Sequence, residues 1–326
     1  MTWLVTGGAG YIGAHVVRRL QADGYPVVVL DDLSTGDPGR VPDDVPLVEA
    51  AVTDRRAVGR VLREHRVGGV VHLAARKSPA ESVARPNWYH RENVGGVAAL
   101  LDAMSGAGVR RLVFSSSAAV YGVPAGSVVN ERTPAAPINP YGRTKLAGER
   151  LIRTAGGADG LSWLALRFFN VVGAAQPRLA DRVPANLVPI VFAALAAGVP
   201  VTVTGADYPT RDGTGVRDYV HVLDVADAHA AAVRRLCTGP PTARVLNVGT
   251  GRGYSVLDVL SRIGAVTARP VPYRIGPRRP GDPPEVIADP TLIGRQLGWR
   301  AAHDLTDMVA SAWLAWSTPP VPATPG

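Results

Sequence analysis

The sequence predicts an α/β protein, a Rossmann-type doubly wound parallel sheet followed by a smaller C-terminal domain. Short apolar runs alternate with longer helical stretches through the first half of the 326-residue chain, which is the pattern of βαβ units. A glycine-rich turn follows the first apolar run, and a Tyr-x-x-x-Lys pair stands on a later helical stretch. These observations favour a nucleotide-binding sheet whose loops carry chemistry.

Apolar runs bounded by turn residues are expected to form the buried parallel strands. They are Trp3–Thr6, Val27–Leu30, Val70–Leu73, Leu112–Phe114 and Trp163–Leu166. The stretches between them are long enough for crossover helices, for example Arg55–His65 and Val94–Met104. Parallel strands need such connections, so the alternation itself predicts a parallel sheet.

The chain divides into two domains by this pattern. We expect the nucleotide-binding domain over residues 1–168 and a smaller substrate-binding domain over 169–317, where regular alternation weakens and Pro and Gly increase. A further strand-plus-helix pattern at 216–236 leaves open whether that segment returns to the first domain. The proline-rich tail, 318–326, is expected to be disordered.

Composition narrows the class of protein. The single cysteine, Cys237, excludes an internal disulfide or a multi-cysteine metal site and fits a reducing, cytoplasmic compartment. No charged segment precedes the first strand, so no signal peptide is expected. The longest apolar run, Leu187–Val201, is broken by Pro and Gly and predicts a buried helix followed by a strand, not a membrane span. No metal site is expected.

The net charge of +8 raises the question of nucleic acid. The arginines are scattered, however, and no basic run is interleaved with stacking aromatics. An anionic small substrate and a solvated surface account for the charge. We therefore expect neither a nucleic-acid nor a membrane partner.

The run TGGAGYIG, Thr6 to Gly13, fits GxGxxG and follows an apolar strand. Such glycines allow backbone N–H groups to approach a pyrophosphate at a helix N-terminus. A glycine-rich turn without function is the alternative, but Asp31 ends the next strand and is placed to accept hydrogen bonds from ribose hydroxyls. Asp31 and Asp32 would repel a 2′-phosphate, so the loop predicts NAD and not NADP.

Tyr141 and Lys145 lie four residues apart in YGRTK, downstream of Ser115, Ser116 and Ser117. On a helix such residues share one face. An ammonium beside a phenol lowers the pKa of the tyrosine and makes it a usable base. The chain has only two lysines, Lys77 and Lys145, against 33 arginines. The pair also arises by chance in some chains, and one or two of the serines are expected to serve only the turn.

The chain resembles the extended short-chain dehydrogenase/reductase family, and within it the UDP-glucose 4-epimerase branch, from about Thr2 to Trp316. The stretches that carry the resemblance are SSSAAVYG at 115–122, NPYGRTK at 139–145, LRFFNVVGA at 166–174, NLVP at 186–189 and DYPTRDGTGVRDYVHV at 207–222. The resemblance implies hydride transfer to and from NAD at carbon 4 of a UDP-sugar. It also implies a homodimer formed through helices near 93–105 and 141–154.

The resemblance implies a role for each matched residue. Tyr141 would be the base, Lys145 would hold the nicotinamide ribose, and Ser117 would bond the reacting sugar oxygen. Cofactor contacts are implied for Gly7, Gly10, Tyr11, Ile12, Gly13, Asp31, Asp32, Lys77, Asn93, Tyr141, Lys145 and Phe169. Substrate contacts are implied for Ser117, Tyr141, Asn170, Asn186, Leu187, Arg217, Arg279, Asp282 and Val286. Among these, Arg217 and Arg279 would meet the diphosphate and Asp282 the uridine ribose.

Three positions depart from the family pattern. Ala51 stands where an Asp usually contacts the adenine, Ala119 replaces a common Thr near the sugar, and Val286 replaces a bulky Tyr at the sugar pocket. The small Val286 predicts that UDP-N-acetylhexosamines are also accepted, unless neighbouring side chains refill the space.

Two other functions remain open from the sequence. A sugar-nucleotide 4,6-dehydratase would share NAD and the Tyr–Lys pair, but Ala118 and Ala119 stand where its acidic pair is needed. An inert NAD-sensing relative is the binding-class alternative, against which the intact Ser, Tyr and Lys argue. Without the resemblance, Arg217 would be interpreted as half of a surface ion pair, and 276–284 as a linker.

Overall fold

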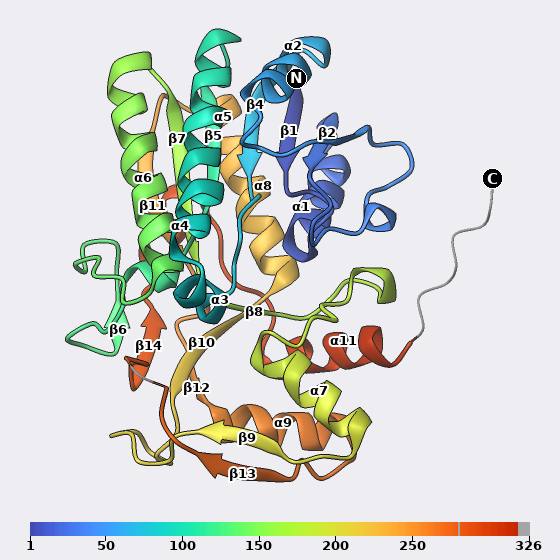
Figure 1. Cartoon of the computed structure of the whole chain (residues 1–326), viewed down its shortest axis with the longest axis vertical. Helices are drawn as coiled ribbons and strands as arrows, with labels where there is room; N and C mark the ends of the chain where they lie inside the picture. Colours follow the sequence, from blue (N-terminus) through green and yellow to red (C-terminus); the bar gives the residue numbers. More distant parts are fainter. Residues whose placement is uncertain (280, 319–326) are drawn as a thin grey trace.

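The computed structural model describes residues 1–279 and 281–318. Figure 1 shows two layers: a large sheet flanked by helices, and below it smaller sheets with their own helices. The predicted doubly wound parallel sheet with a smaller second layer is confirmed.

The large sheet has seven strands in the order β11-β7-β5-β4-β1-β2-β3, and every pair is parallel. All five apolar runs predicted to be strands lie in or overlap it. The strands are β1 (Thr2–Thr6), β2 (Val27–Asp31), β3 (Leu47–Glu49), β4 (Val67–His72), β5 (Arg111–Ser117), β7 (Ser162–Phe168) and β11 (Ala243–Val248).

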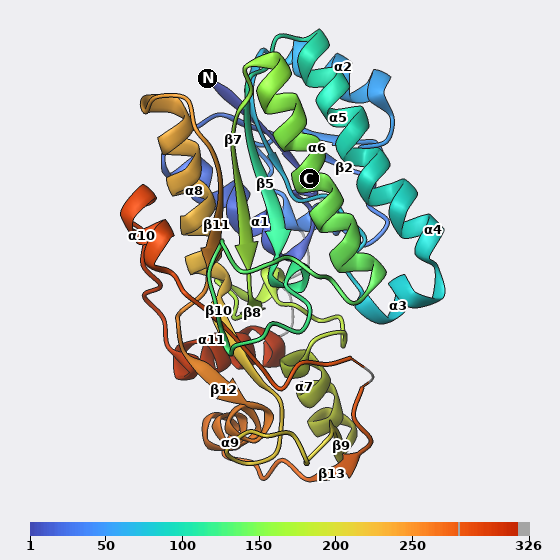
Figure 2. The ribbon, with the colours of Figure 1, turned by 90° about the vertical axis from the view of Figure 1, so that its left-hand side faces the viewer.

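Helices cover both faces of this sheet because its strands are apolar on both sides. On β1, Leu4 packs in one core with α2, α5 and α6, whereas Trp3 and Val5 pack in another with α1 and α8. Figure 2 shows these two groups of helices on opposite sides of the strands. Their bounds are α1 (Tyr11–Ala22), α2 (Arg55–Glu64), α3 (Pro79–Ala84), α4 (Pro86–Tyr89), α5 (Gly95–Gly106), α6 (Pro140–Asp159), α8 (Val222–Thr238) and α10 (Thr291–Leu297).

The second layer contains a sheet in which β12, β10, β14 and β6 follow one another, while β8 also pairs with β10. Its strands are β6 (Val128–Val129), β8 (Asn170–Val172), β10 (Val216–His221), β12 (Gly253–Ser255) and β14 (Glu285–Ala288). A third sheet joins β9 (Val201–Thr204) to β13 (Tyr273–Gly276), and the helices are α7 (Leu187–Ala197), α9 (Val256–Thr267) and α11 (Leu305–Ser317). The helix-then-strand prediction for 187–201 is confirmed by α7 and β9.

The segment 216–236 is shared between the layers. Its strand β10 pairs with β8, β12 and β14 of the second layer, whereas its helix α8 packs against α1 of the large sheet. The following strand, β11, pairs with β7. The tail prediction for 318–326 falls on residues outside the described part of the chain, except for Thr318. Within residues 1–279 and 281–318, no helix is long and apolar enough to cross a membrane.

Candidate functional site

The glycine loop joins β1 to α1 at the carboxyl edge of the large sheet. Gly7 has a φ of +74°, and a Cβ there would lie 2.7 Å from the Ala74 backbone nitrogen, so only glycine fits this turn. A Cβ at Gly13 would overlap the Gly7 carbonyl oxygen. Gly10, in extended conformation, begins α1 without a side-chain cap. The first N–H groups of α1 therefore point out of the loop with no side chain bound to them, as an anion site requires.

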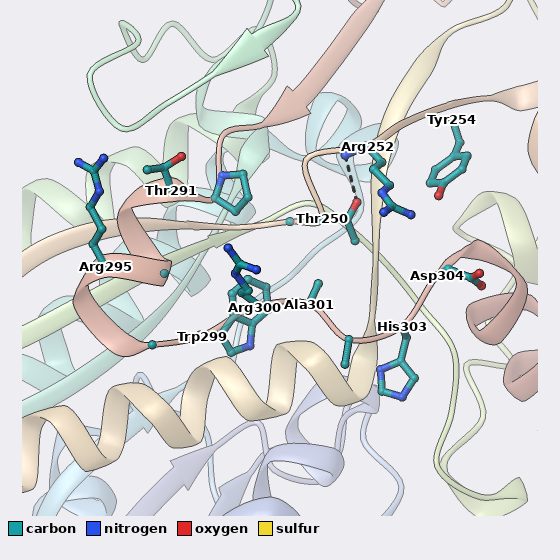
Figure 3. A pocket seen from close by; sticks show the side chains of 15 residues that line it. Thr250, Arg252, Tyr254, Thr291, Arg295, Trp299, Arg300, Ala301, His303 and Asp304 are labelled. Atoms are coloured by element: carbon teal, nitrogen blue, oxygen red, sulfur yellow. Dashed lines mark hydrogen bonds between the residues drawn. The ribbon is translucent and has the colours of Figure 1, made fainter.

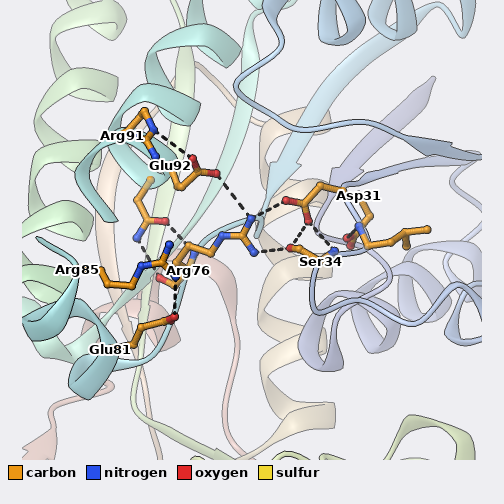
Figure 4. A network of polar contacts seen from close by, with 10 residues as sticks. Asp31, Ser34, Arg76, Glu81, Arg85, Arg91 and Glu92 are labelled. Atoms are coloured by element: carbon orange, nitrogen blue, oxygen red, sulfur yellow. Dashed lines mark hydrogen bonds and ion pairs between the residues drawn. The ribbon is translucent and has the colours of Figure 1, made fainter. Parts of the chain in front are cut away.

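Asp31 ends β2 beside this loop, and Asp32 follows it. The Asp31 carboxylate accepts bonds from the Ala9 nitrogen at 2.9 Å and the Leu33 nitrogen at 3.0 Å. Burial raises the pKa of Asp31, although these bonds oppose the shift. Although burial opposes it, bonds from Ser34 and Arg76 lower the pKa of Asp32. Figure 4 shows Arg76 reaching the Asp31–Ser34 turn from another loop. The predicted repulsion of a 2′-phosphate by Asp32 is thus partly neutralised by Arg76.

The three serines at the end of β5 have different surroundings. Ser115 Oγ lies 2.8 Å from His229 Nε2, and Ser116 donates to Glu149 at 2.6 Å, both in the buried core. Only Ser117 is half-exposed, with its hydroxyl accepting from the Ala119 nitrogen at 3.2 Å. Ser115 and Ser116 therefore serve the core, and Ser117 alone is available to a ligand.

Helix α6 carries the Tyr–Lys pair past the end of β5. Asn139 caps it by accepting from the Gly142 nitrogen, and Pro140 occupies its first position. Tyr141 and Lys145 are both buried, with the ammonium 6.0 Å from the phenol ring centroid. Lys145 donates to the Ser115 carbonyl at 2.9 Å, which fixes the ammonium at the end of β5.

The predicted lowering of the tyrosine pKa is not what the structure gives. Burial raises the pKa of Tyr141, and a hydrogen bond with Ser117 opposes that shift. The Lys145 ammonium is directed to the Ser115 carbonyl and does not reverse this raised pKa. Burial lowers the pKa of Lys145 itself to about 8, although Glu149 opposes the shift. The protein alone therefore holds a neutral phenol beside a lysine that titrates near neutral pH.

Glu149, which sequence reasoning missed, lies one turn beyond Lys145. Its carboxylate accepts from Ser116 and from Arg167 Nε at 2.8 Å and Nη2 at 2.6 Å, in a pair almost sealed from solvent. Arg167 on β7 also stacks over Tyr121 at 4.9 Å. The network locks α6 onto β5 and β7. The Lys-x-x-x-Glu spacing was the available signal, since residues four apart on a helix are neighbours.

The other predicted cofactor residues lie on the same edge of the sheet but differ in burial and in hydrogen-bond partners. The side-chain amide of Asn93 makes hydrogen bonds with the backbone N–H and C=O of Arg76 and with the Thr144 hydroxyl. It therefore holds the loop that carries Arg76 in place. Lys77 is exposed in that loop. Tyr11 donates its hydroxyl to the Gly173 carbonyl at 2.6 Å, which leaves only its backbone facing the glycine loop. Ile12 packs on the core below α1, and Phe169 is buried after β7.

Apart from Ser117 and Tyr141, the predicted substrate residues belong to the second layer. Arg217 on β10 forms an ion pair with Asp282 at 2.6 Å. Two residues predicted to bind the substrate therefore bind each other in this structure. Arg279, three residues before Asp282, is exposed. Val286 on β14 is paired with Arg217 across the two neighbouring strands. Arg217, Asp282 and Val286 therefore lie close together.

The remaining substrate positions are more open. Asn170 begins β8 and is exposed, and Asn186 precedes α7 with its amide 3.2 Å from Asp181. Leu187 begins α7 and packs on the second-layer core. Val286 is buried in a small cluster that includes Tyr121 and Phe169. Aromatic rings therefore pack around the position where the family has a Tyr.

A cavity of about 640 Å³ lies elsewhere, between β12, α10 and the segment 298–304. Figure 3 shows Arg252, Arg295 and Arg300 around it. All three are exposed, and the cavity contains none of the residues predicted to act. Its arginines fit a solvated face of an arginine-rich chain, so we assign it no role.

Two departures have visible structural settings. Ala51 lies two residues after β3, and the next acid along the chain, Asp54, is used to cap α2 by accepting from the Arg56 and Ala57 nitrogens. Ala119 lies in a short 3-10 turn, and its carbonyl faces Gly142 closely enough to exclude a Cβ there.

Comparison with known proteins gives a consistent result. Residues 3–249 match the model of the NAD dependent epimerase/dehydratase family. The chain is 43% identical to the UDP-glucose 4-epimerase of Azospirillum brasilense, over 96% of this chain and 91% of that protein.

Solved structures agree with this over nearly the whole chain. A UDP-glucose-4-epimerase from Stenotrophomonas maltophila, with bound NAD and formylated UDP-arabinopyranose, superposes with a TM-score of 0.91 at 44% identity, over 97% of each chain. The UDP-Glc/GlcNAc 4-epimerase of Campylobacter jejuni superposes with a TM-score of 0.85 at 35% identity, over 97% of this chain and 98% of that one.

Proposed function

This chain belongs to the NAD-dependent epimerase/dehydratase family, and from that premise we propose that it interconverts UDP-glucose and UDP-galactose at carbon 4. It is an NAD-dependent isomerase. The observation that carries the assignment to particular residues is the meeting of Ser117, Tyr141 and Lys145 at the carboxyl end of β5, on the same sheet edge as the glycine loop, with β4 between them.

The residues present fit NAD. The uncapped N-terminus of α1 supplies backbone donors for a pyrophosphate, and Gly7 and Gly13 keep the turn tight enough for close approach. Asp31, held by two backbone N–H groups, keeps lone pairs for ribose hydroxyls. Lys145 uses one of three donors on Ser115 and keeps the others for a ribose.

When bound, NAD accepts a hydride from carbon 4 of the sugar and returns it to that carbon. The role of the chain in this chemistry is proton transfer and positioning. Tyr141 takes the proton of the 4-hydroxyl as that carbon is oxidised, and gives it back when the resulting ketone is reduced from the opposite face. Ser117 holds the same sugar oxygen and bonds the phenol, so both groups address one atom.

Lys145 has a second task in this account. The neutral phenol of the protein alone is a weak base, since burial raises its pKa. A positive charge brought close to Tyr141 favours the phenolate. Lys145, buried on the same helix face, supplies such a charge while its ammonium stays protonated, below a pKa of about 8.

We assign the nucleotide of the substrate mainly to residues 169–317, which form the second layer apart from α8, β11 and α10, and NAD mainly to residues 1–168, which form most of the large sheet. Arg217 and Arg279 are proposed to meet the diphosphate, for which planar guanidinium donors are suited. Asp282 is paired with Arg217 in this structure. We propose that its carboxylate also accepts hydrogen bonds from the uridine ribose hydroxyls when the substrate binds. Asn170, Asn186 and Leu187 are proposed to contact the nucleotide and its phosphates.

We propose that the sugar range includes UDP-N-acetylhexosamines. Support comes from the small side chain of Val286 and from the similarity to the UDP-Glc/GlcNAc 4-epimerase of Campylobacter jejuni. The neighbouring Tyr121 and Phe169 limit how much of the space is free, since both belong to the cluster that buries Val286.

We also propose that two copies pair through α5 and α6, which lie side by side in Figure 2. Leu101 on α5 and Leu151 on α6 are half-buried apolar side chains of these helices. Sedimentation of the protein and of a Leu151→Arg variant tests this. The parent should have the mass of a dimer and the variant that of a monomer.

Turnover without added cofactor tests the proposed function. Purified protein is incubated with UDP-galactose and, separately, with UDP-N-acetylgalactosamine, and the products are separated by anion-exchange chromatography. We expect UDP-glucose from the first and a slower conversion of the second. No turnover of either sugar, even with NAD supplied, would rule out the proposed activity.

A further inference from the structure

Arg76 spans the carboxyl edge of the large sheet from one loop to another. It follows β4, whereas its partners Asp32 and Ser34 follow β2. Strand β1 lies between β4 and β2 in the sheet, and the glycine loop follows β1. The strand order therefore has the Arg76 side chain cross from the β4 side of β1 to the β2 side, and Figure 4 shows it meeting the turn that carries Asp31 and Ser34.

Several groups hold this guanidinium. Its Nη2 lies 2.8 Å from the Asp32 carboxylate and 3.7 Å from Glu92, and its Nη1 donates to the Ser34 hydroxyl. Its central carbon lies 4.9 Å from the Trp88 ring centroid. The side chain is only 17% exposed. We call the set Arg76, Asp32, Ser34 and Glu92 the Arg76 bridge.

The base of the Arg76 bridge is tied to the catalytic helix. Asn93 accepts from the Arg76 nitrogen at 2.8 Å and donates to the Arg76 carbonyl at 3.0 Å. The same amide donates to Thr144 on α6 at 3.0 Å, one residue before Lys145. The backbone of Arg76 is thus fixed relative to the proposed base, and only its side chain has to move for the bridge to open.

We propose that Arg76 is a positioning residue that closes the Arg76 bridge over the dinucleotide and slows its release. The inference rests on the proposed function, because NAD is expected on the glycine loop that the side chain crosses. Dinucleotide resting on that loop can leave past β1 only after the guanidinium gives up Asp32 and Ser34. The bridge would compensate, in dinucleotide retention, for the adenine contact that Ala51 cannot make.

The charge arrangement supports this role. Asp32 would otherwise place a free carboxylate close to the phosphates of a dinucleotide. Although burial opposes it, Ser34 and Arg76 lower the pKa of Asp32, so the carboxylate stays ionised and paired. A guanidinium bound to a carboxylate and a hydroxyl keeps further N–H donors, which is the capacity a nearby phosphate uses.

The test compares six versions of the full-length protein: the parent, Arg76→Leu, Asp32→Asn, the double variant that combines these two, Arg76→Lys and the control Arg85→Leu. Arg85 stacks on the same Trp88 ring at 3.8 Å, but its ion partner, Glu81, lies on α3 rather than on the β2 side. The readouts are the amount of NAD and NADH retained per protomer after prolonged dialysis and the rate of release into a dehydrogenase trap. Thermal midpoints measured at saturating NAD separate release from unfolding.

We expect Arg76→Leu and Asp32→Asn each to release dinucleotide roughly 10-fold faster, because each removes a charge-assisted bond at a partly exposed site. Combining them should add little, since both open one bridge. Arg85→Leu should match the parent. Arg76→Lys should restore part of the retention, because an ammonium can reach Asp32 without spanning Ser34 and Glu92 at once.

Two results would overturn the inference in distinguishable ways. If the parent and Arg76→Leu both contain dinucleotide and release it at the same rate, the role of the Arg76 bridge is refuted and the proposed function is unaffected. A parent protein that binds no NAD or NADH even when supplied with it removes the proposed function and the bridge together.

Discussion

Replacing Glu149 by Gln should destabilise the protein strongly and also alter its pH profile. Glu149 and Arg167 are 2% and 5% exposed at the side chain, and the carboxylate accepts from both Ser116 and Arg167. Glutamine keeps the shape but turns one acceptor into an NH₂ donor facing the Arg167 guanidinium. The buried charge of Arg167 then loses its counterion.

The magnitude follows from that burial. Removing one partner of a buried ion pair costs about 3–5 kcal/mol, because the other charge is left without compensation. We therefore expect the urea-unfolding free energy to fall by about 3–5 kcal/mol. The exposed Glu64→Gln, at the end of α2, is the matched control and should change it by less than about 0.5 kcal/mol.

The catalytic consequence has a defined direction. Glu149 opposes the lowering of the Lys145 pKa, so its loss moves that pKa further below about 8. Lys145 is charged only below its pKa, so the alkaline limb of the activity profile should shift to lower pH. Wild-type stability in Glu149→Gln, or an unchanged alkaline limb in the folded variant, would refute the role given to this network.

Further predictions concern the glycine loop, the base, the sugar pocket and acid stability. Gly13→Ala should lose stability and retained NAD because its Cβ overlaps a carbonyl, whereas Gly157→Ala, in open space on α6, should be neutral or slightly stabilising. Tyr141→Phe should lose activity by about 10²–10⁴-fold while keeping its fold and NAD, and near-parental turnover would exclude it as the base. Val286→Tyr should lower turnover of UDP-N-acetylgalactosamine more than that of UDP-galactose, and equal losses would show that this position does not select the sugar. Unfolding free energy should fall as the pH drops from about 6.5 toward about 4. Burial lowers the pKa of four histidines, so the unfolded chain binds more protons there. Asp218, with a pKa raised to about 6, opposes this, as do Asp31, Glu131 and Asp227, whose pKa values burial also raises. Flat stability over that range would contradict the assignment. The histidines are His15 and His229, with pKa values of about 4, His72, about 3, and His221, about 4.

The large sheet was predictable because its strands are buried on both faces. Runs such as Val27–Leu30 leave little alternative to a parallel strand between helices. The second layer was harder to predict. Its strands are short, and β10 pairs with β8 and β14, which come from segments far away in the chain. Local periodicity carries no information about such pairings, which explains why the placement of 216–236 stayed open.

At the site, residue types were predictable and their partners were not. The spacing of Tyr141 and Lys145 indicates one helix face, but where the ammonium points depends on the Ser115 carbonyl. The direction of the Tyr141 pKa was wrong because burial, a tertiary property, outweighs a charge that is directed elsewhere. Arg76 was missed because nothing in its own segment shows that β2 ends within its reach.

The transfer of one labelled hydrogen tests the central claim most directly. UDP-galactose carrying deuterium at carbon 4 is incubated with the protein in ordinary water, without added NAD, and the product is analysed by mass spectrometry and NMR. If Tyr141 moves only the hydroxyl proton while the hydride stays within the site, UDP-glucose should keep the deuterium at carbon 4. Product in which that deuterium has been replaced by solvent hydrogen would contradict the account.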